Sequence, residues 1–166
     1  MHQPKRLLLI TGPPGSGKTT ALLGAVGRLR SAGFSVGGFA TKEVREGGAD
    51  AGVRVGFEVI DLHSGKRGWL ARAGSKRGPR VGRYTVDLDS FESVAVPAII
   101  YAMERCGAVA IDEVGPMELF SRGFRGAVES ALGSGKLLIA TVHWRSGDPL
   151  VTRLKAFCRG MRSSSR

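Results

Sequence analysis

The chain has 166 residues, and 25 lysines and arginines against 14 acidic residues give it a formal net charge of +11 at pH 7. The length allows one core made of a sheet with flanking helices, and no apolar run approaches the roughly 20 residues that a membrane span requires. Two distant cysteines and three scattered histidines exclude a disulfide scaffold and a zinc-type cluster. We therefore expect one monomeric domain, over residues 1–166, in a reducing cytoplasm and without a membrane partner.

The first predicted element is a strand followed at once by a glycine-rich loop. The apolar run Leu7–Ile10 predicts a strand buried on both faces of a parallel sheet. The letters GPPGSGKT over Gly12–Thr19 then fill every position of the phosphate-binding pattern G-x-x-x-x-G-K-(S/T). Its glycines let the backbone curl, so that N–H groups turn inward and form a nest for phosphate oxygens.

A helix is predicted directly after the loop. Apolar residues recur there at three- and four-residue spacing, up to an expected end near Gly33: Ala21, Leu22, Ala25, Val26 and Leu29. The start of this helix favours an anion through its dipole. Lys18 adds a mobile positive charge, and Thr19 offers a hydroxyl to a magnesium ion that accompanies a nucleoside triphosphate.

The next stretch predicts a second strand and then antiparallel hairpins. Phe34–Thr41 completes a β-α-β unit. Period-two alternation in Val53–Ile60, between glycine turns at 47–48 and 64–65, predicts a hairpin insertion over 42–86. Its part from 42 to 83 holds five acidic and ten basic residues: Lys42, Arg45, Arg54, Lys66, Arg67, Arg72, Lys76, Arg77, Arg80 and Arg83. This excess suggests RNA or another polyanion as a partner, and a generally basic surface without such a partner is an equally weighted alternative.

The following segment predicts a short strand and a helix that contains a proline. Tyr84–Leu88 reads as the strand, and Asp89 or Ser90 offers the helix cap. Pro97 cannot donate a hydrogen bond within a helix. We therefore expect either a kink there, or a turn at 90–95 with a new helix that begins at Pro97 and ends near Arg105.

A second buried strand ends in two carboxylates. The apolar run from Ala108 leads directly into Asp112 and Glu113. In open α/β sheets, ligands bind at the carboxyl ends of the strands, where the glycine-rich loop also lies. We therefore expect the loop and the two carboxylates to face one crevice.

The last third of the chain predicts a helix, a strand and a helix. The first helix follows Ser121 and has an apolar face. The strand Leu137–Val142 presents Thr141 and His143 at its carboxyl end. The last helix begins near Asp148. We interpret a lone histidine in this place as more often structural than catalytic. We expect residues 159–166 to form a frayed basic tail.

Several of these stretches together resemble the small thermostable nucleoside-triphosphatases, also described as cancer-related nucleoside-triphosphatases. The resemblance rests on Gly12–Thr19, on Thr41–Gly48 followed by Gly56-Phe57, on Tyr84–Leu88 with Phe91-Glu92, and above all on Ile111–Leu119. It implies an α/β fold, a three-layer P-loop domain with a mainly parallel sheet. It also implies Mg²⁺-dependent hydrolysis of ATP, GTP and other nucleoside triphosphates to diphosphate and phosphate. Family members usually continue beyond the last helix with another strand, so we expect a sheet that lacks an edge strand.

The residues and the resemblance together give a set of candidate roles. Lys18 would hold the β- and γ-phosphates, Thr19 and Asp112 would hold Mg²⁺, and Glu113 would act as general base toward water. His143 is the alternative base. Arg122, Arg125 and Arg145 are unranked candidates for stabilising the transition state, with arginines of the basic hairpins as alternatives. The nucleotide-binding candidates are Gly12, Pro13, Pro14, Gly15, Ser16, Gly17, Lys18, Thr19, Thr20 and Asp112.

Two other functions fit the same residues. A P-loop kinase could transfer the phosphoryl group to a nucleoside, a small metabolite or a polynucleotide end. An RNA-binding protein with weak ATPase activity would use the basic hairpins. A screen for acceptors other than water separates the first from a hydrolase, and stimulation of turnover by RNA supports the second.

Overall fold

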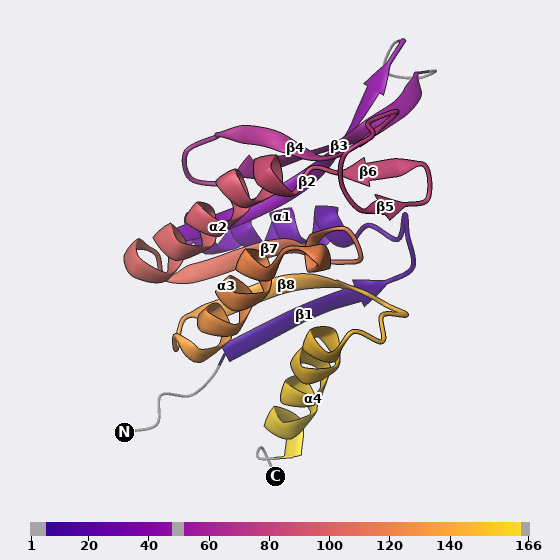
Figure 1. The fold of residues 1–166 in the computed structure, drawn as a ribbon. Coiled ribbons are helices and arrows are strands. Elements are labelled where there is room, and N and C mark those ends of the chain that lie inside the picture. The colour runs from indigo at the N-terminus through magenta and orange to yellow at the C-terminus, as the bar shows by residue number, and fades with distance from the viewer. Residues whose placement is uncertain (1–5, 48–51, 164–166) are drawn as a thin grey trace.

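The structure is a computed structural model that describes residues 6–47 and 52–163. Within these residues the strands form one eight-stranded sheet in the order β1-β8-β7-β2-β3-β4-β6-β5 (Figure 1). The strands are β1 (Arg6–Gly12), β2 (Val36–Glu46), β3 (Val53–Asp61), β4 (Arg67–Ala73), β5 (Arg80–Val81), β6 (Tyr84–Val86), β7 (Ala108–Val114) and β8 (Leu137–His143). The helices are α1 (Lys18–Ser31), α2 (Leu88–Arg105), the one-turn 3₁₀ helix η1 (Glu118–Phe120), α3 (Arg122–Gly133) and α4 (Pro149–Ser163).

One half of the sheet is parallel. β8 pairs in parallel with β1 and β7, and β7 pairs in parallel with β2. Their carboxyl ends therefore share one edge of the sheet, as predicted. β1 was predicted to be buried on both faces, and this is wrong in part: within the described chain β1 pairs only with β8, and Leu8 is 47% exposed.

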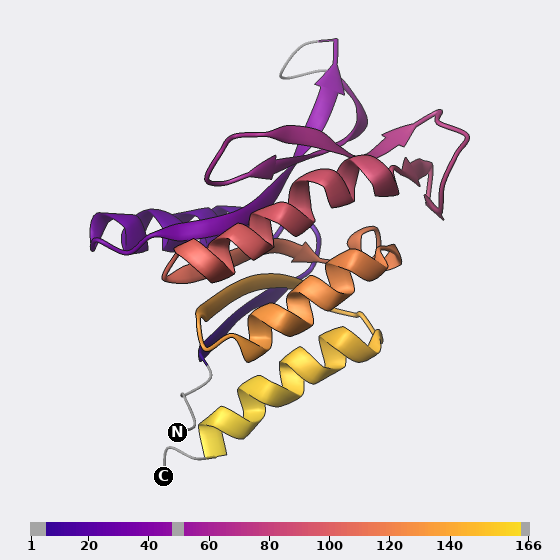
Figure 2. The same ribbon diagram turned by 60° about the vertical axis from the view of Figure 1, so that its left-hand side comes forward.

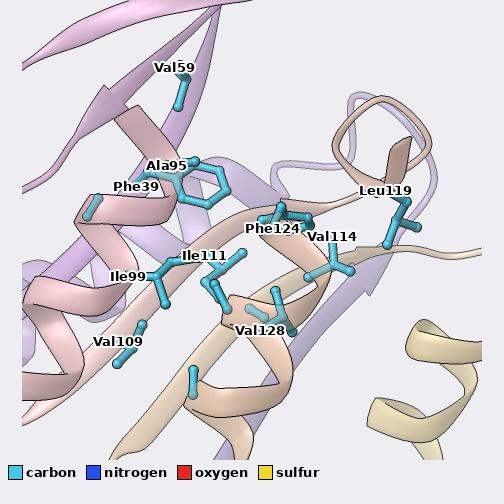
Figure 3. Packing of buried hydrophobic residues seen from close by; sticks show 14 of the residues in the cluster. Phe39, Val59, Ala95, Ile99, Val109, Ile111, Val114, Leu119, Phe124 and Val128 are labelled. Carbon is cyan, nitrogen blue, oxygen red and sulfur yellow. The ribbon is translucent and has the colours of Figure 1, made fainter. Parts of the chain in front are cut away.

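The parallel half lies between two layers of helices. α1 covers one face, while α2, α3 and α4 cover the other (Figures 1 and 2). Successive residues of β7 point to opposite faces, so Ala110 packs in the α1 layer and Ile111 in the other. On the α2–α3 side, the rings of Phe39, Phe91 and Phe124 meet edge to face at 5.5–5.8 Å. Figure 3 shows how this larger core joins α2 and α3 to the sheet.

The predicted hairpins extend the same sheet. β2 leaves β7 at Phe39 and continues to Glu46 while it pairs with β3 in antiparallel fashion. β4, β6 and β5 then add to β3 as further antiparallel strands. The far ends of β2 and β3 project beyond the helical layers (Figure 2). The antiparallel insertion is thus confirmed, while residues 48–51 lie outside the described part.

α2 corrects two details of the sequence analysis. Its cap is Asp87, whose Oδ1 accepts the Ser90 N–H at 3.0 Å, and β6 accordingly ends at Val86. Asp89 and Ser90 lie inside the helix. α2 also runs through Pro97 as one helix, so a separate helix beginning at Pro97 was wrong.

The C-terminal segment is more ordered than expected. α4 continues to Ser163, so most of the predicted frayed tail is helical, and residues 164–166 lie outside the described part. Leu150 and Leu154 of this helix are buried against the sheet. None of the described helices is long and apolar enough to cross a membrane.

Candidate active site

The glycine-rich loop connects the end of β1 to the start of α1. Gly15 and Gly17 have φ values of 75° and 86°, a left-handed conformation that favours glycine. A Cβ at Gly12 would lie 2.5 Å from the Ser16 hydroxyl oxygen, so only glycine fits there without displacing that side chain. The loop is mostly exposed, and α1 begins at Lys18. The strand, loop and helix order is therefore the one that a phosphate nest requires.

Asp112 connects the loop to two strands. It lies at the end of β7 and is only 2% exposed. Its Oδ2 accepts the Thr19 hydroxyl at 2.9 Å, and its Oδ1 accepts the Thr141 hydroxyl of β8 at 2.7 Å. Within the described chain no ion pair involves this carboxylate. A buried carboxylate that has only neutral donors suits a cation, and hydroxyl and carboxylate oxygens are the ligands that Mg²⁺ prefers.

Glu113 faces the cation of the loop. Its Oε2 lies 3.2 Å from the Lys18 Nζ, and the two side chains are 23% and 12% exposed. The turn after β7 packs closely behind the carboxylate, since a Cβ at Gly115 would lie 2.3 Å from the Glu113 Oε1. The Glu113 carboxylate therefore lies between the Lys18 ammonium group and the Gly115 backbone, next to the glycine-rich loop.

A cavity of about 200 Å³ opens beside these groups. Its polar lining combines the two carboxylates with other side chains, namely Thr19, Thr41, Asp112, Glu113, Glu118 and His143. The apolar lining comes from the antiparallel strands and the turn after β7, namely Phe57, Leu70, Val81, Pro116 and Met117. The insertion thus supplies one wall of the site. Such a wall strengthens electrostatic interactions by limiting water.

Glu118 is a third carboxyl group in this cavity. It begins η1 and is 3% exposed. Burial raises the pKa of Glu118 well above its ordinary value, and the negative charges of Glu113 and Asp112 raise it further, against backbone hydrogen bonds that lower it. The Glu118 carboxyl therefore holds its proton at pH values where an exposed glutamate is ionised.

The structure separates the candidate arginines. Arg125 forms a two-pronged ion pair with Asp148 and also donates its Nε–H to the Leu119 carbonyl at 2.6 Å. These contacts hold the guanidinium in a structural role. Arg145 stacks over the Trp144 ring at 4.2 Å, and Arg122 is exposed at the start of α3. His143 lines the cavity, and its Nδ1 accepts the Arg145 N–H at 3.3 Å.

The predicted constellation comes together in space. Lys18, Thr19, Asp112 and Glu113 meet within hydrogen-bonding or ion-pairing distance, and Thr20 is exposed one residue farther along α1. Glu118 was not predicted to belong to the site, although a carboxylate five residues after Glu113 in an apolar stretch was a usable signal. The apolar wall had no local signal, because its residues are distant from the loop in sequence.

Comparison with known proteins identifies the family. The family model described as NTPase matches residues 7–161. A protein named nucleoside-triphosphatase THEP1 from Methanothermobacter thermautotrophicus is 53% identical over 140 residues, which cover 82% of this chain and 75% of the relative. The human cancer-related nucleoside-triphosphatase is 44% identical over 155 residues, which cover 87% of this chain and 79% of the relative. The chain belongs to this nucleoside-triphosphatase family.

The fold agrees with that of a family member of known structure. The crystal structure of THEP1 from the hyperthermophile Aquifex aeolicus matches with a TM-score of 0.77 at 33% identity, covering 90% of this chain and 83% of that chain. The family and the P-loop α/β fold that the sequence predicted are both confirmed.

Proposed function

We propose that this family member hydrolyses nucleoside triphosphates to nucleoside diphosphate and phosphate at the junction of the loop and β7. The proposal rests on the contacts between four side chains, two from the start of α1 and two from β7. Thr19 donates to Asp112 at 2.9 Å, and Lys18 pairs with Glu113 at 3.2 Å. Family membership supports hydrolysis over transfer to another acceptor.

The loop and Lys18 bind the phosphates in this proposal. Inward N–H groups of the loop donate to phosphate oxygens, and the start of α1 adds its partial positive charge. A triphosphate in the nest competes with Glu113 for the Lys18 ammonium group. Binding therefore shifts this cation toward the β- and γ-phosphates and leaves the Glu113 carboxylate available to accept a proton.

Thr19 and Asp112 fit a magnesium ion. The fit rests on the buried Asp112 carboxylate, which receives two neutral hydroxyl groups and has no counter-cation within the described residues. The described residues also hold no cluster of three or more His, Cys, Asp or Glu side chains that alone could hold a metal, in keeping with an ion shared with phosphate oxygens. When bound, Mg²⁺ would neutralise charge on the β- and γ-phosphates.

Glu113 is the general base of the proposed reaction. Its carboxylate accepts a proton from a water molecule, while the water oxygen forms a bond to the γ-phosphorus. The bond between the γ-phosphorus and the β–γ bridging oxygen breaks, and the nucleoside diphosphate leaves with that electron pair. The apolar wall made by Phe57, Leu70 and Val81 limits access of further water to this step.

The basic insertion supports a second proposal, namely a polyanion surface. Three of its ten basic side chains form ion pairs: Arg45 and Arg54 with Glu43, and Arg67 with Glu58. The other seven have no ion pair within the described chain. Uncompensated charge of this kind attracts phosphate backbones, so RNA is the partner class that we propose.

The hydrolysis proposal is tested by removing the loop cation. Lys18→Ala should abolish most nucleotide binding and phosphate release, because no other group in the loop carries a positive charge. The matched control is Lys76→Ala, which removes one exposed charge from the insertion. Phosphate release and thermal unfolding are measured for both variants. Wild-type turnover of Lys18→Ala under saturating Mg²⁺ and ATP would place the active site elsewhere.

A further inference from the structure

Glu118 is an acid in a place where an ionised acid is costly. Its side chain is 3% exposed, and it shares the 200 Å³ cavity with Glu113 and Asp112. No lysine, arginine or histidine within the described part of the chain forms an ion pair with it. The cavity walls next to it, Pro116 and Met117, contribute no charge. A leucine or methionine would fill such a position at lower cost in desolvation.

The turn that carries Glu118 also supports Glu113. The chain reverses after β7, and the Leu119 N–H donates to the Gly115 carbonyl at 3.0 Å. Gly115 in turn packs against the Glu113 carboxylate so closely that it has no room for a Cβ. Backbone hydrogen bonding by Glu118 and Gly115 lowers the pKa of the Glu118 carboxyl, against the larger effects of burial and Glu113 that raise it. Glu113 and Glu118 therefore flank one tight turn, and both line the same cavity.

A neutral carboxyl group suits this place. Such a group donates one O–H and accepts through its other oxygen, so it can hold a neighbouring carboxylate without adding charge. Among the side chains around Glu118, Glu113 has the largest electrostatic effect on the Glu118 pKa, and that effect raises it. When a triphosphate competes for Lys18, Glu113 loses its cationic partner. The same cavity lining then offers it the Glu118 O–H, on the turn that also carries Glu113, besides the Thr41 hydroxyl and His143.

We propose that Glu118 is a positioning residue for hydrolysis: its carboxyl group holds the Glu113 side chain toward the attacking water. This inference rests on the proposed role of Glu113. It assigns no proton transfer to Glu118, which acts only by orienting the group that accepts the proton. It also assigns Glu118 no metal, because a protonated carboxyl is a poor ligand.

Two substitutions at Glu118 separate orientation from simple filling of space. Glu118→Met keeps the volume and loses the hydrogen bond, so kcat should fall about 10- to 100-fold with little change in KM, as expected for a misplaced catalytic group. Glu118→Gln keeps a neutral donor and acceptor of the same length and should recover most of that loss, to within about five-fold of the parent. Thermal unfolding without nucleotide checks that both variants fold.

A double-substitution cycle with Glu113→Gln decides whether the effect passes through Glu113. Single-turnover hydrolysis is measured for Glu113→Gln alone and with Glu118→Met added. The proposal predicts that Glu118→Met then slows the reaction by less than about two-fold, because the group it orients no longer accepts a proton.

Three results would overturn the proposal. Glu118→Met with parental kcat would make Glu118 a packing residue. Glu118→Gln as slow as Glu118→Met would show that the ionised form is needed. An equal loss from Glu118→Met with and without Glu113→Gln would show that Glu118 acts independently. If Glu113→Gln alone still hydrolyses the nucleotide rapidly, then Glu113 is not the general base, and this result is distinct from the three above.

Discussion

Asp112 shows how one side chain organises the site. It accepts hydroxyl groups from Thr19 of α1 and Thr141 of β8, and it belongs to β7, so three elements meet at its two oxygens. Its near-complete burial gives these bonds a low-dielectric setting in which charge interactions are strong. A cation bound here would be held by a carboxylate that these two hydroxyl groups already orient.

Asp112→Asn should weaken both nucleotide affinity and turnover. The amide keeps the size and can still accept a hydroxyl, but it lacks the charge that holds a metal. Raising Mg²⁺ should recover part of the activity. The comparison variant is Thr141→Val, which removes one hydroxyl from the Asp112 carboxylate, a hydrogen bond to a charged group worth about 1.5–3 kcal/mol. It should change the Mg²⁺ dependence much less than Asp112→Asn, because the charge that attracts the metal stays. Activity profiles against Mg²⁺ that coincide for Asp112→Asn and the parent would refute metal binding by Asp112.

The residues of the site differ in how far the sequence could predict them. Lys18 and Thr19 belong to a contiguous pattern, and Asp112 follows an apolar strand, so local signals were enough. Glu118 enters the cavity only because the turn at Gly115 folds back. Phe57 reaches it from β3 across the antiparallel extension. Long-range placement of this kind has no local pattern.

Among the elements, α2 illustrates both the success and the limit of reading a sequence. The cap residues after Leu88 predicted a helix that ends near Arg105, and this end is confirmed. Of the two outcomes expected at Pro97, the separate new helix is absent, because α2 continues through the proline. Proline lacks an N–H, which leaves the Ser93 carbonyl without its usual helical donor. The Lys66 Nζ, from the turn between β3 and β4, lies 3.3 Å from that carbonyl and donates to it. A residue 27 positions away thus compensates for the proline.

The start of α4 depends on a contact with α3. Asp148 accepts the Leu150 N–H at 2.9 Å as a cap, and it also pairs with Arg125 through both carboxylate oxygens. The Asp148→Asn variant keeps an acceptor for the cap but loses the ion pair. Because the Arg125 side chain is 36% exposed, we expect a loss of only about 1 kcal/mol in the free energy of unfolding at pH 7. Urea unfolding measures this loss.

The ion pair between Asp148 and Arg125 makes the stability lost in Asp148→Asn depend on pH. The hydrogen bond from Arg125 lowers the pKa of Asp148 below its ordinary value of 3.8. The folded state therefore binds this proton less tightly than the unfolded state, so the stabilisation is complete above the ordinary pKa and is lost as the pH falls through the lowered one. The difference between parent and Asp148→Asn should shrink below about pH 4. An equal difference at pH 7 and pH 3 would contradict the ion pair as its source.

At the scale of the whole molecule, charge is distributed unevenly over the fold. The antiparallel extension carries five more basic than acidic residues between positions 42 and 83, and it also forms the apolar wall of the cavity. Its far end projects beyond the helical layers (Figure 2). A polyanion bound there would lie on the same strands that line the active site.

Single-stranded RNA should bind with an affinity that falls steeply with salt, with a slope of about 0.7 per phosphate contact in a plot of log affinity against log salt. A double Arg77→Ala and Arg80→Ala variant should reduce this slope by about 1.4. Arg67→Ala should change it less, because Arg67 already pairs with Glu58 at 2.9 Å. Fluorescence anisotropy at several salt concentrations gives the slopes. If no RNA binds even at low salt, the extension serves only as a wall of the site.

Glu113 is proposed to accept the proton of the attacking water, and the Glu113→Gln variant tests this role most directly. The amide cannot accept that proton, while Lys18, Thr19 and Asp112 remain to bind Mg-ATP. Nucleotide affinity should stay close to that of the parent, and single-turnover phosphate release should slow by about 10²- to 10⁴-fold, the range for loss of a general base. Hydrolysis within a few-fold of the parent at equal nucleotide occupancy would contradict the account and favour another base, such as His143.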